Sequence, residues 1–134
     1  MIGYFRGIDK PQYNILDELI VQGIRFGINH HIYMELLQGT KTEREFEQLR
    51  EYLGSLPFYE LKYGEKSYEK AAQLHIKCRQ NGVTIRSTID LIIAQTAIEN
   101  ELYLLHNDAD YANMAKVIPQ LKIYRIDQPN EEFQ

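Results

Sequence analysis

The stretch STIDLIIAQTAIENELYLLHNDADY, residues 87–111, decides the fold class of this chain. Its first half is apolar at nearly every helical position, and a helix that is apolar almost all round is buried. Ser87 favours the start of that helix, and the leucine-rich segment 102–106 predicts a strand directly after it. A second helix is expected over 109–118. A buried helix, a strand and another helix in succession are typical of a parallel sheet covered by helices.

The alternation of helices and strands extends along the rest of the chain. Amphipathic spacing predicts helices, and short runs of apolar and aromatic residues predict strands. We expect one α/β domain over residues 1–134, a length that buries a substantial core. The further expected helices are 11–22, 29–37, 42–56 and 65–81, and the further expected strands are 24–28, 58–62 and 122–126.

The composition excludes several classes of protein. The single cysteine, Cys78, allows neither an internal disulfide nor a cysteine-rich zinc site. No apolar run reaches the roughly 20 residues that span a bilayer, and residues 1–10 lack the apolar core of a signal peptide. We therefore expect a soluble cytoplasmic protein. The net charge of −4 does not attract nucleic acid, so RNA binding needs local basic residues or bound cations.

Asp90 opens the apolar helix and has two interpretations. The sequence Ser87-Thr88-Ile89-Asp90 matches a capping box in which Asp replaces the usual Glu, so a structural role explains it. Alternatively, Asp90 lies at the edge of the core, where an unpaired charge is costly. A metal ion or another cationic partner offsets that cost.

Asp108 and Asp110 also have two interpretations. Asp108 is suited to cap the helix 109–118, and Asp110 to favour the dipole of its first turn. However, Asp108 follows the strand 102–106 directly, and ligands of open α/β sheets bind beyond the carboxyl ends of strands. The helix that contains Asp90 runs antiparallel to this strand. We therefore expect Asp90 and Asp108 at the same edge of the sheet.

Glu35 is the third candidate acid. It is compatible with an exposed position on an amphipathic helix, where His31 pairs with it across one turn. This helix follows the strand 24–28, so its first turn is expected at the same carboxyl edge. Acids from three separate segments then converge. Carboxylate oxygens suit Mg²⁺ or Mn²⁺, which activate water and stabilise the displacement at a phosphodiester.

Three motifs in this order and spacing resemble those of the PIN-domain ribonucleases. ELLQG at 35–39 matches the end of a short helix in that family, DLIIAQTA at 90–97 matches its third-acid pattern, and NDADY at 107–111 matches its late pattern. Within the family, the chain resembles the toxin half of VapBC-type toxin–antitoxin pairs. The resemblance covers nearly the whole chain.

The resemblance implies a three-layer α/β/α fold with a mostly parallel central sheet. It implies Mg²⁺ or Mn²⁺ held by Glu35, Asp90, Asp108 and Asp110, with Glu35, Asp90 and Asp108 as catalytic residues. It further implies metal-dependent RNA cleavage, a small antitoxin partner and a homodimer.

The beginning of the chain departs from the family pattern. Members open with an apolar strand that ends in Asp-Thr or Asp-Ser, a few residues before a stretch like Tyr-Phe-Arg-Gly. Here YFRG occupies residues 4–7 and only three residues precede it. We therefore expect the strand that bears this aspartate to be missing from residues 1–134. Cleavage is then expected to be impaired.

Two other classes of function remain open. A PIN-fold module that binds an antitoxin-like partner without turnover is compatible with the missing aspartate. A phosphoacceptor signalling domain has similar layers, but it needs an acidic pair after the first strand and a lysine after the last. The last expected strand leads instead into Arg125-Ile126-Asp127. Loss of RNA cleavage with a chelator separates the nuclease from the binding module.

Overall fold

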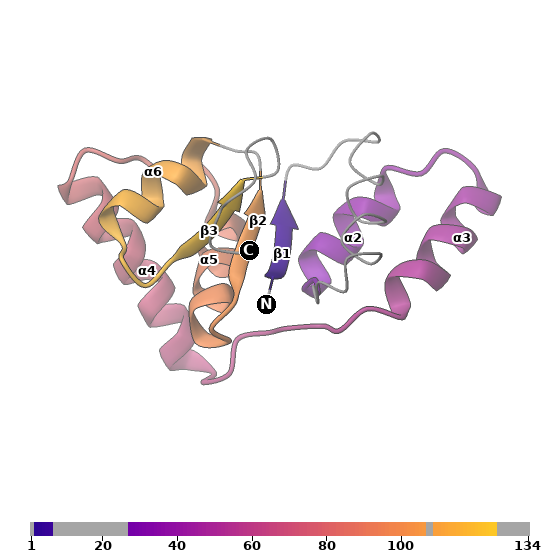
Figure 1. The fold of residues 1–134 in the computed structure, drawn as a ribbon, viewed down its shortest axis with the longest axis horizontal. Coiled ribbons are helices and arrows are strands. Elements are labelled where there is room, and N and C mark those ends of the chain that lie inside the picture. Colours follow the sequence, from indigo (N-terminus) through magenta and orange to yellow (C-terminus); the bar gives the residue numbers. More distant parts are fainter. Residues whose placement is uncertain (1, 7–26, 107–108, 126–134) are drawn as a thin grey trace.

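The computed structural model describes residues 2–6, 27–106 and 109–125 (Figure 1). The predicted helix 11–22 lies outside these residues. Within them the strands are β1 (Ile2–Arg6), β2 (Tyr103–His106) and β3 (Lys122–Arg125), and the helices are α2 (His30–Gln38), α3 (Glu43–Gly54), α4 (Glu65–Gln80), α5 (Thr88–Glu99) and α6 (Ala109–Val117). These helices and the last two strands were predicted to within about two residues at each end.

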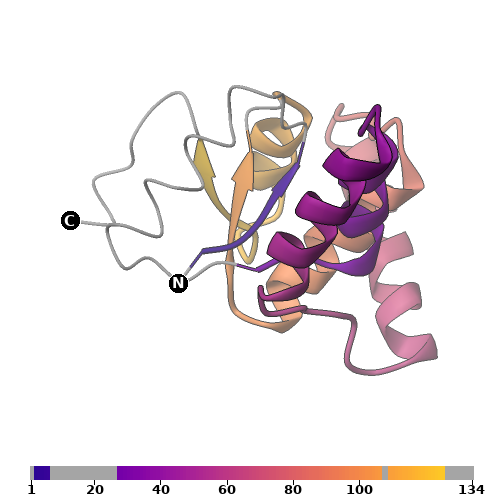
Figure 2. The same ribbon diagram turned by 90° about the vertical axis from the view of Figure 1, so that its right-hand side faces the viewer.

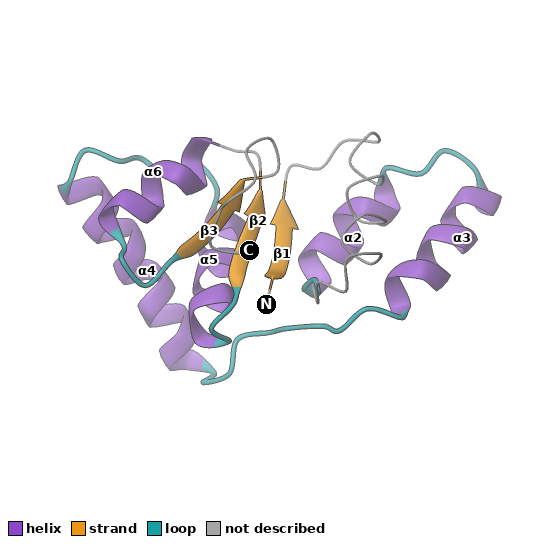
Figure 3. Ribbon diagram, viewed as in Figure 1, coloured by secondary structure: helices purple, strands orange, loops and turns teal. Residues whose placement is uncertain are grey.

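The three strands form one sheet in the order β1-β2-β3, and both neighbouring pairs are parallel (Figure 3). Leu105 in the central strand pairs with Phe5 on one side and with Tyr124 on the other. Parallel neighbours need a crossover connection, and α6 provides it between β2 and β3. The parallel sheet that the sequence predicted is therefore present.

Strand β1 was not expected from the sequence. Its residues, IGYFR, include an isoleucine and two aromatic residues that favour a pleated strand. It pairs with β2, the strand that leads towards the Asp108–Asp110 segment. The sequence of β1 contains no acid, so it does not supply the aspartate with which the family's first strand ends.

The prediction of a strand over 58–62 is wrong. Phe58 forms only an isolated parallel bridge with Ile28, and the residues after it are not in a strand. Pro57 has no backbone N–H to give to a ladder. The carbonyl of Glu60 accepts a hydrogen bond from the side chain of Asn100 (3.0 Å). The Glu60 carbonyl is therefore bonded to a side chain and not to a neighbouring strand. Of the expected strand 24–28, only residues 27 and 28 are described.

Helix α5 is buried, as its sequence predicted. Ile93, Ala94 and Ala97 are fully buried, and they share one core with Leu104 of β2 and Met114 of α6. Figure 2 shows α2 to α5 on one side of the sheet. No helix in the described part of the chain is long and apolar enough to cross a membrane.

Candidate metal centre

Asp90 lies in the first turn of α5 with only 6% of its surface exposed. The hydroxyl group of Tyr111 donates a hydrogen bond to its Oδ1 atom (2.9 Å). Tyr111 is fully buried and belongs to α6, directly after Asp110. A buried carboxylate needs donors of this kind. The bond joins the beginnings of α5 and α6, and Figure 1 shows that α6 begins at the edge where β2 ends.

The side-chain bond from Ser87 that the capping box around Asp90 predicts is not formed. Ser87 is the N-cap residue of α5, but its side chain makes no capping hydrogen bond. The backbone N–H of Asp90 donates to the carbonyl of Ser87 instead (3.1 Å). Reciprocal capping therefore does not explain why this carboxylate is buried against Tyr111.

Asp110 lies in the first turn of α6, one residue before Tyr111. Its Oδ1 atom is 3.4 Å from Nη2 of Arg86, the residue just before the N-cap of α5. The Arg86 side chain is 81% exposed and that of Asp110 only 17%. This ion pair and the Tyr111 bond both connect the start of α5 to the start of α6. Asp90 and Asp110 therefore share one edge; the edge was predicted for Asp90 and Asp108, and Asp108 lies outside the described residues.

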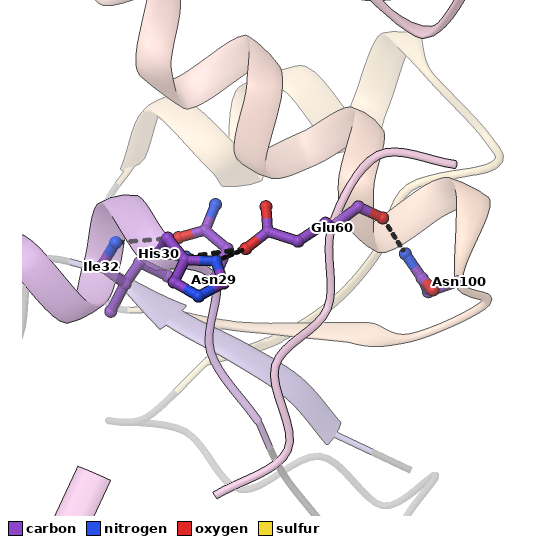
Figure 4. Close-up of polar contacts among 5 residues, drawn as sticks. All are labelled: Asn29, His30, Ile32, Glu60 and Asn100. Atoms are coloured by element: carbon purple, nitrogen blue, oxygen red, sulfur yellow. Dashed lines mark hydrogen bonds and ion pairs between the residues drawn. The ribbon is translucent and has the colours of Figure 1, made fainter. Parts of the chain in front are cut away.

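Glu35 is half-buried in the second turn of α2. The N-terminus of this helix is held by Glu60, whose Oε1 atom accepts from the backbone N–H of His30 (3.0 Å) and contacts its ring (Figure 4). The carbonyl of Glu60 binds Asn100, the C-cap residue of α5. Asn100 and Asp90 are at opposite ends of α5.

The prediction that the first turn of α2 lies at the carboxyl edge is therefore wrong. It assumed that residues 24–28 form an ordinary strand of the parallel sheet. Among the described residues, Ile28 pairs with Phe58 and not with β1. Helix α2 consequently starts near the end of α5 that precedes β2, and Figure 1 shows it running from there alongside β1. Glu35 lies on this helix, past its first turn.

The complete predicted ligand set is not assembled by the described residues. In residues 2–6, 27–106 and 109–125, no three His, Cys, Asp or Glu side chains gather closely enough to hold a metal ion. Asp108, the fourth predicted ligand, is outside them, so the set remains a prediction. The metal-ligating atoms that Asp90 and Asp110 offer nevertheless suit Mg²⁺ or Mn²⁺. They are carboxylate oxygens, which are the ligands that these hard cations prefer.

The part played by Tyr111 is not evident from the sequence pattern. The NDADY motif contains Tyr111 but does not indicate a partner for its hydroxyl group. The available signal was a tyrosine, which needs a hydrogen-bond partner when buried, one residue after an acid and near a second buried acid. The structure supplies that partner as Asp90.

Glu99 at the far end of α5 has a different environment. Its Oε1 atom accepts from the backbone N–H of Lys62 (2.8 Å) and the hydroxyl of Ser67 (3.0 Å), and its Oε2 atom accepts from Gln95 (2.9 Å). Burial alone would raise the pKa of Glu99. These three hydrogen bonds and the charge of Lys70 outweigh that effect and hold the pKa below its ordinary value.

Residues 2–117, most of the chain, match the family model of the PIN domain. The chain belongs to the PIN-domain family. The resemblance stated from the ELLQG, DLIIAQTA and NDADY motifs is thereby confirmed.

Individual relatives of this PIN domain are VapC proteins. Ribonuclease VapC11 of Mycobacterium tuberculosis is 27% identical over 96 residues, which cover 72% of this chain and 71% of that protein. Ribonuclease VapC6 of the same organism is 28% identical over 93 residues, covering 69% and 72%. The crystal structure of VapBC2 from Rickettsia felis bound to a DNA fragment from its promoter contains a chain that matches with a TM-score of 0.65. That match has 22% identity over 93% of this chain and 98% of the other. It confirms the predicted fold class, the three-layer α/β/α PIN fold.

Proposed function

We propose that this PIN domain is a metal-dependent endoribonuclease, the toxin component of a type II toxin–antitoxin pair. The observation that carries the proposal is the buried Asp90 carboxylate, held by Tyr111 beside Asp110 at the carboxyl edge of the sheet. The names of the VapC relatives support RNA as substrate, and the VapBC2 match supports a small antitoxin as partner. We further propose Mg²⁺ or Mn²⁺ as cofactor, a cytoplasmic location and a homodimer.

Each residue of the candidate centre has a distinct part in this proposal. Asp90 and Asp110, together with Glu35 and Asp108, would hold the cation. When bound, the cation supplies charge stabilisation and an activated water for hydrolysis of a phosphodiester. Tyr111 orients the Asp90 carboxylate through its hydroxyl group. The exposed guanidinium of Arg86 is suited to bind a phosphate of the RNA, because arginine recognises phosphate oxygens in a bidentate manner.

The proposal is tested by cleavage of RNA with the purified chain in Mg²⁺, in Mn²⁺ and in excess EDTA. We expect cleavage with either metal, none in EDTA, and none with Asp90→Asn. Glu51→Gln is the matched control, because Glu51 is an exposed acid on α3. Cleavage that persists in EDTA, or in Asp90→Asn at the wild-type rate, would contradict the proposal.

A non-catalytic module that binds an antitoxin-like partner is the second candidate. It is favoured by one observation, the absence of an acid from β1. An N-terminal extension that supplies an apolar strand ending in Asp-Thr separates the two. If the present chain is an impaired nuclease, the extension raises metal-dependent cleavage and the same extension ending in Asn-Thr does not. If the chain is only a binding module, both extensions leave it inactive while it still binds its partner.

A further inference from the structure

Helix α4 carries exposed apolar side chains on its outer surface. Tyr68 is 57% and Ile76 is 43% exposed, and Ala72 between them is also exposed. The opposite side of the helix, with Ala71 and Cys78, is buried and packs towards α5. Figure 1 shows α4 at the outer left of the molecule, at the end opposite to α3.

The exposed residues form a stripe with a symmetric arrangement about Ala72. Tyr68 and Ile76 lie four residues before and after it, and Glu65 and Arg79 lie seven residues before and after it. With about 100° of rotation per residue, these five side chains fall within roughly 80° of the helix circumference. We call them the α4 stripe.

This arrangement makes the α4 stripe complementary to a second copy of itself. If two α4 helices pack antiparallel with their Ala72 residues in contact, each Tyr68 faces Ile76 of the other copy. Each Glu65 then faces Arg79 of the other copy. Two apolar pairs and two opposite-charge pairs form at once, related by a twofold axis through Ala72, which is the self-complementary form of a symmetric dimer interface.

The charged ends of the α4 stripe are available for such pairing. Among the described residues, neither Glu65 nor Arg79 has an ion-pair partner within its own chain. A small residue at the crossing point lets two helices approach to an axis separation of roughly 8 Å. Like-charge contacts would arise only in the parallel arrangement, so the charges also select the antiparallel one.

We propose that the α4 stripe is the surface through which two copies of this chain associate. The proposal rests on the homodimer proposed above and names the face that forms it. It is independent of RNA cleavage, because no residue of the stripe belongs to the candidate metal centre.

Charge exchange at Glu65 and Arg79 tests the proposal by sedimentation of the full chain. Both residues are exposed, so the variants are expected to fold. Glu65→Arg or Arg79→Glu alone replaces two attractive pairs by two repulsive ones. We expect an increase of about ten-fold in the dimer dissociation constant from each. The double variant Glu65→Arg/Arg79→Glu restores the pairing and recovers the wild-type constant. Lys66→Glu, an exposed charge reversal outside the stripe, leaves it unchanged.

A cross-link tests the position of the axis. Two Ala72 Cα atoms at the crossing would be roughly 5 Å apart, within the range that a disulfide spans. Ala72→Cys is therefore expected to give a covalent dimer on mild oxidation, and Gln73→Cys is not. The native Cys78 is buried and does not interfere.

The outcomes separate this proposal from the one on which it rests. A wild-type chain that sediments as a monomer at every concentration overturns both the dimer and its interface. A dimer that none of the charge variants weakens, and that Ala72→Cys does not link, shows that the chains associate through another face and overturns the α4 stripe alone.

Discussion

The two ends of helix α5 each carry an acid, and the two acids are held in different ways. At the C-terminal end, both oxygens of Glu99 accept hydrogen bonds from donors of the surrounding chain, and the pKa is lowered despite burial. At the N-terminal end, Asp90 is buried against the hydroxyl group of Tyr111, with Asp110 and Arg86 nearby.

The difference separates a structural acid from a candidate ligand. Glu99 connects α5 to the loop before α4 through Lys62 and to the first turn of α4 through Ser67, because both residues donate to it. Its role is complete within the chain. Asp90 instead lies in the first turn of α5 and is bonded to the start of α6, which follows β2, at the edge where open α/β sheets bind their ligands. The C-terminal end of α5 thus holds neighbouring segments of the chain together, and its N-terminal end carries an acid of the candidate metal centre.

Replacing Asp90 is expected to have the largest effect on activity. Asp90→Asn removes a negative charge from the candidate centre, and we expect RNA cleavage to fall at least about 100-fold. The melting temperature without metal should hold or rise, because the variant no longer buries a carboxylate near other acids. Cleavage assays and thermal unfolding measure the two quantities.

The rise in melting temperature on addition of metal tests separately whether Asp90 binds the cation. A cation that binds only the folded state raises the melting temperature, and Asp90→Asn should abolish that rise. A variant that keeps the full rise with Mg²⁺ or Mn²⁺ would leave Asp90 with a purely structural role.

Replacing Glu99 is expected to act on stability alone. Glu99→Ala leaves the donors of Lys62, Ser67 and Gln95 without their acceptor, which costs about 1–3 kcal/mol of unfolding free energy. Urea unfolding measures the loss, with Glu51→Ala on α3 as the exposed control. Cleavage by the folded fraction should remain at the wild-type rate. A loss of cleavage without a loss of stability would contradict a purely structural role for Glu99.

Tyr111→Phe tests whether the hydroxyl group positions Asp90. The ring stays in the core while the bond to the carboxylate is lost, so we expect metal affinity to weaken roughly ten-fold. Stability should fall by only about 1 kcal/mol. Calorimetric titration with Mn²⁺ gives the affinity, and Tyr63→Phe in an exposed loop position is the control. Unchanged affinity would show that the Tyr111 bond serves only to pack α6 against α5.

The smallest expected effect is the pH dependence of the stabilisation that Glu99 contributes to the fold. Its pKa is lower in the folded chain than its ordinary value of 4.5, so its stabilisation is present above that pH and is lost as pH falls through the folded pKa. Wild type and Glu99→Gln should therefore differ in unfolding free energy at neutral pH and converge in acid. A difference that grows in acid would contradict the assignment.

The elements of the fold were largely predictable, and the errors have local causes. Helix α5 and strand β2 follow from an apolar helix pattern and a leucine-rich run, because burial leaves a strong periodic signal. The false strand at 58–62 arose because the sequence does not reveal that the Glu60 carbonyl binds Asn100. A hydrogen bond between a backbone group and a side chain far away in the sequence does not change the hydrophobic periodicity from which strands are predicted.

The candidate site was predictable only in part. Chain direction predicts a common edge for Asp90 and Asp108, and Asp108 lies outside the described residues; Asp110, two residues further on, is connected to the start of α5 through Tyr111 and Arg86. The start of α2 was misplaced because its position depends on which strand residue 28 pairs with. Such pairings are long-range and cannot be read from local composition. The ligand set that includes Glu35 and Asp108 stays a prediction.

A titration with Mn²⁺ monitored by amide NMR tests whether the metal binds at the N-terminal end of α5. The paramagnetic ion broadens signals near its binding site. We expect early broadening at Asp90, Asp110 and Tyr111, while the amides of Glu99 and Asn100 stay sharp. Early broadening at Glu99 and Asn100, or uniform broadening along α5, would show that the N-terminal end of this helix is not the metal site.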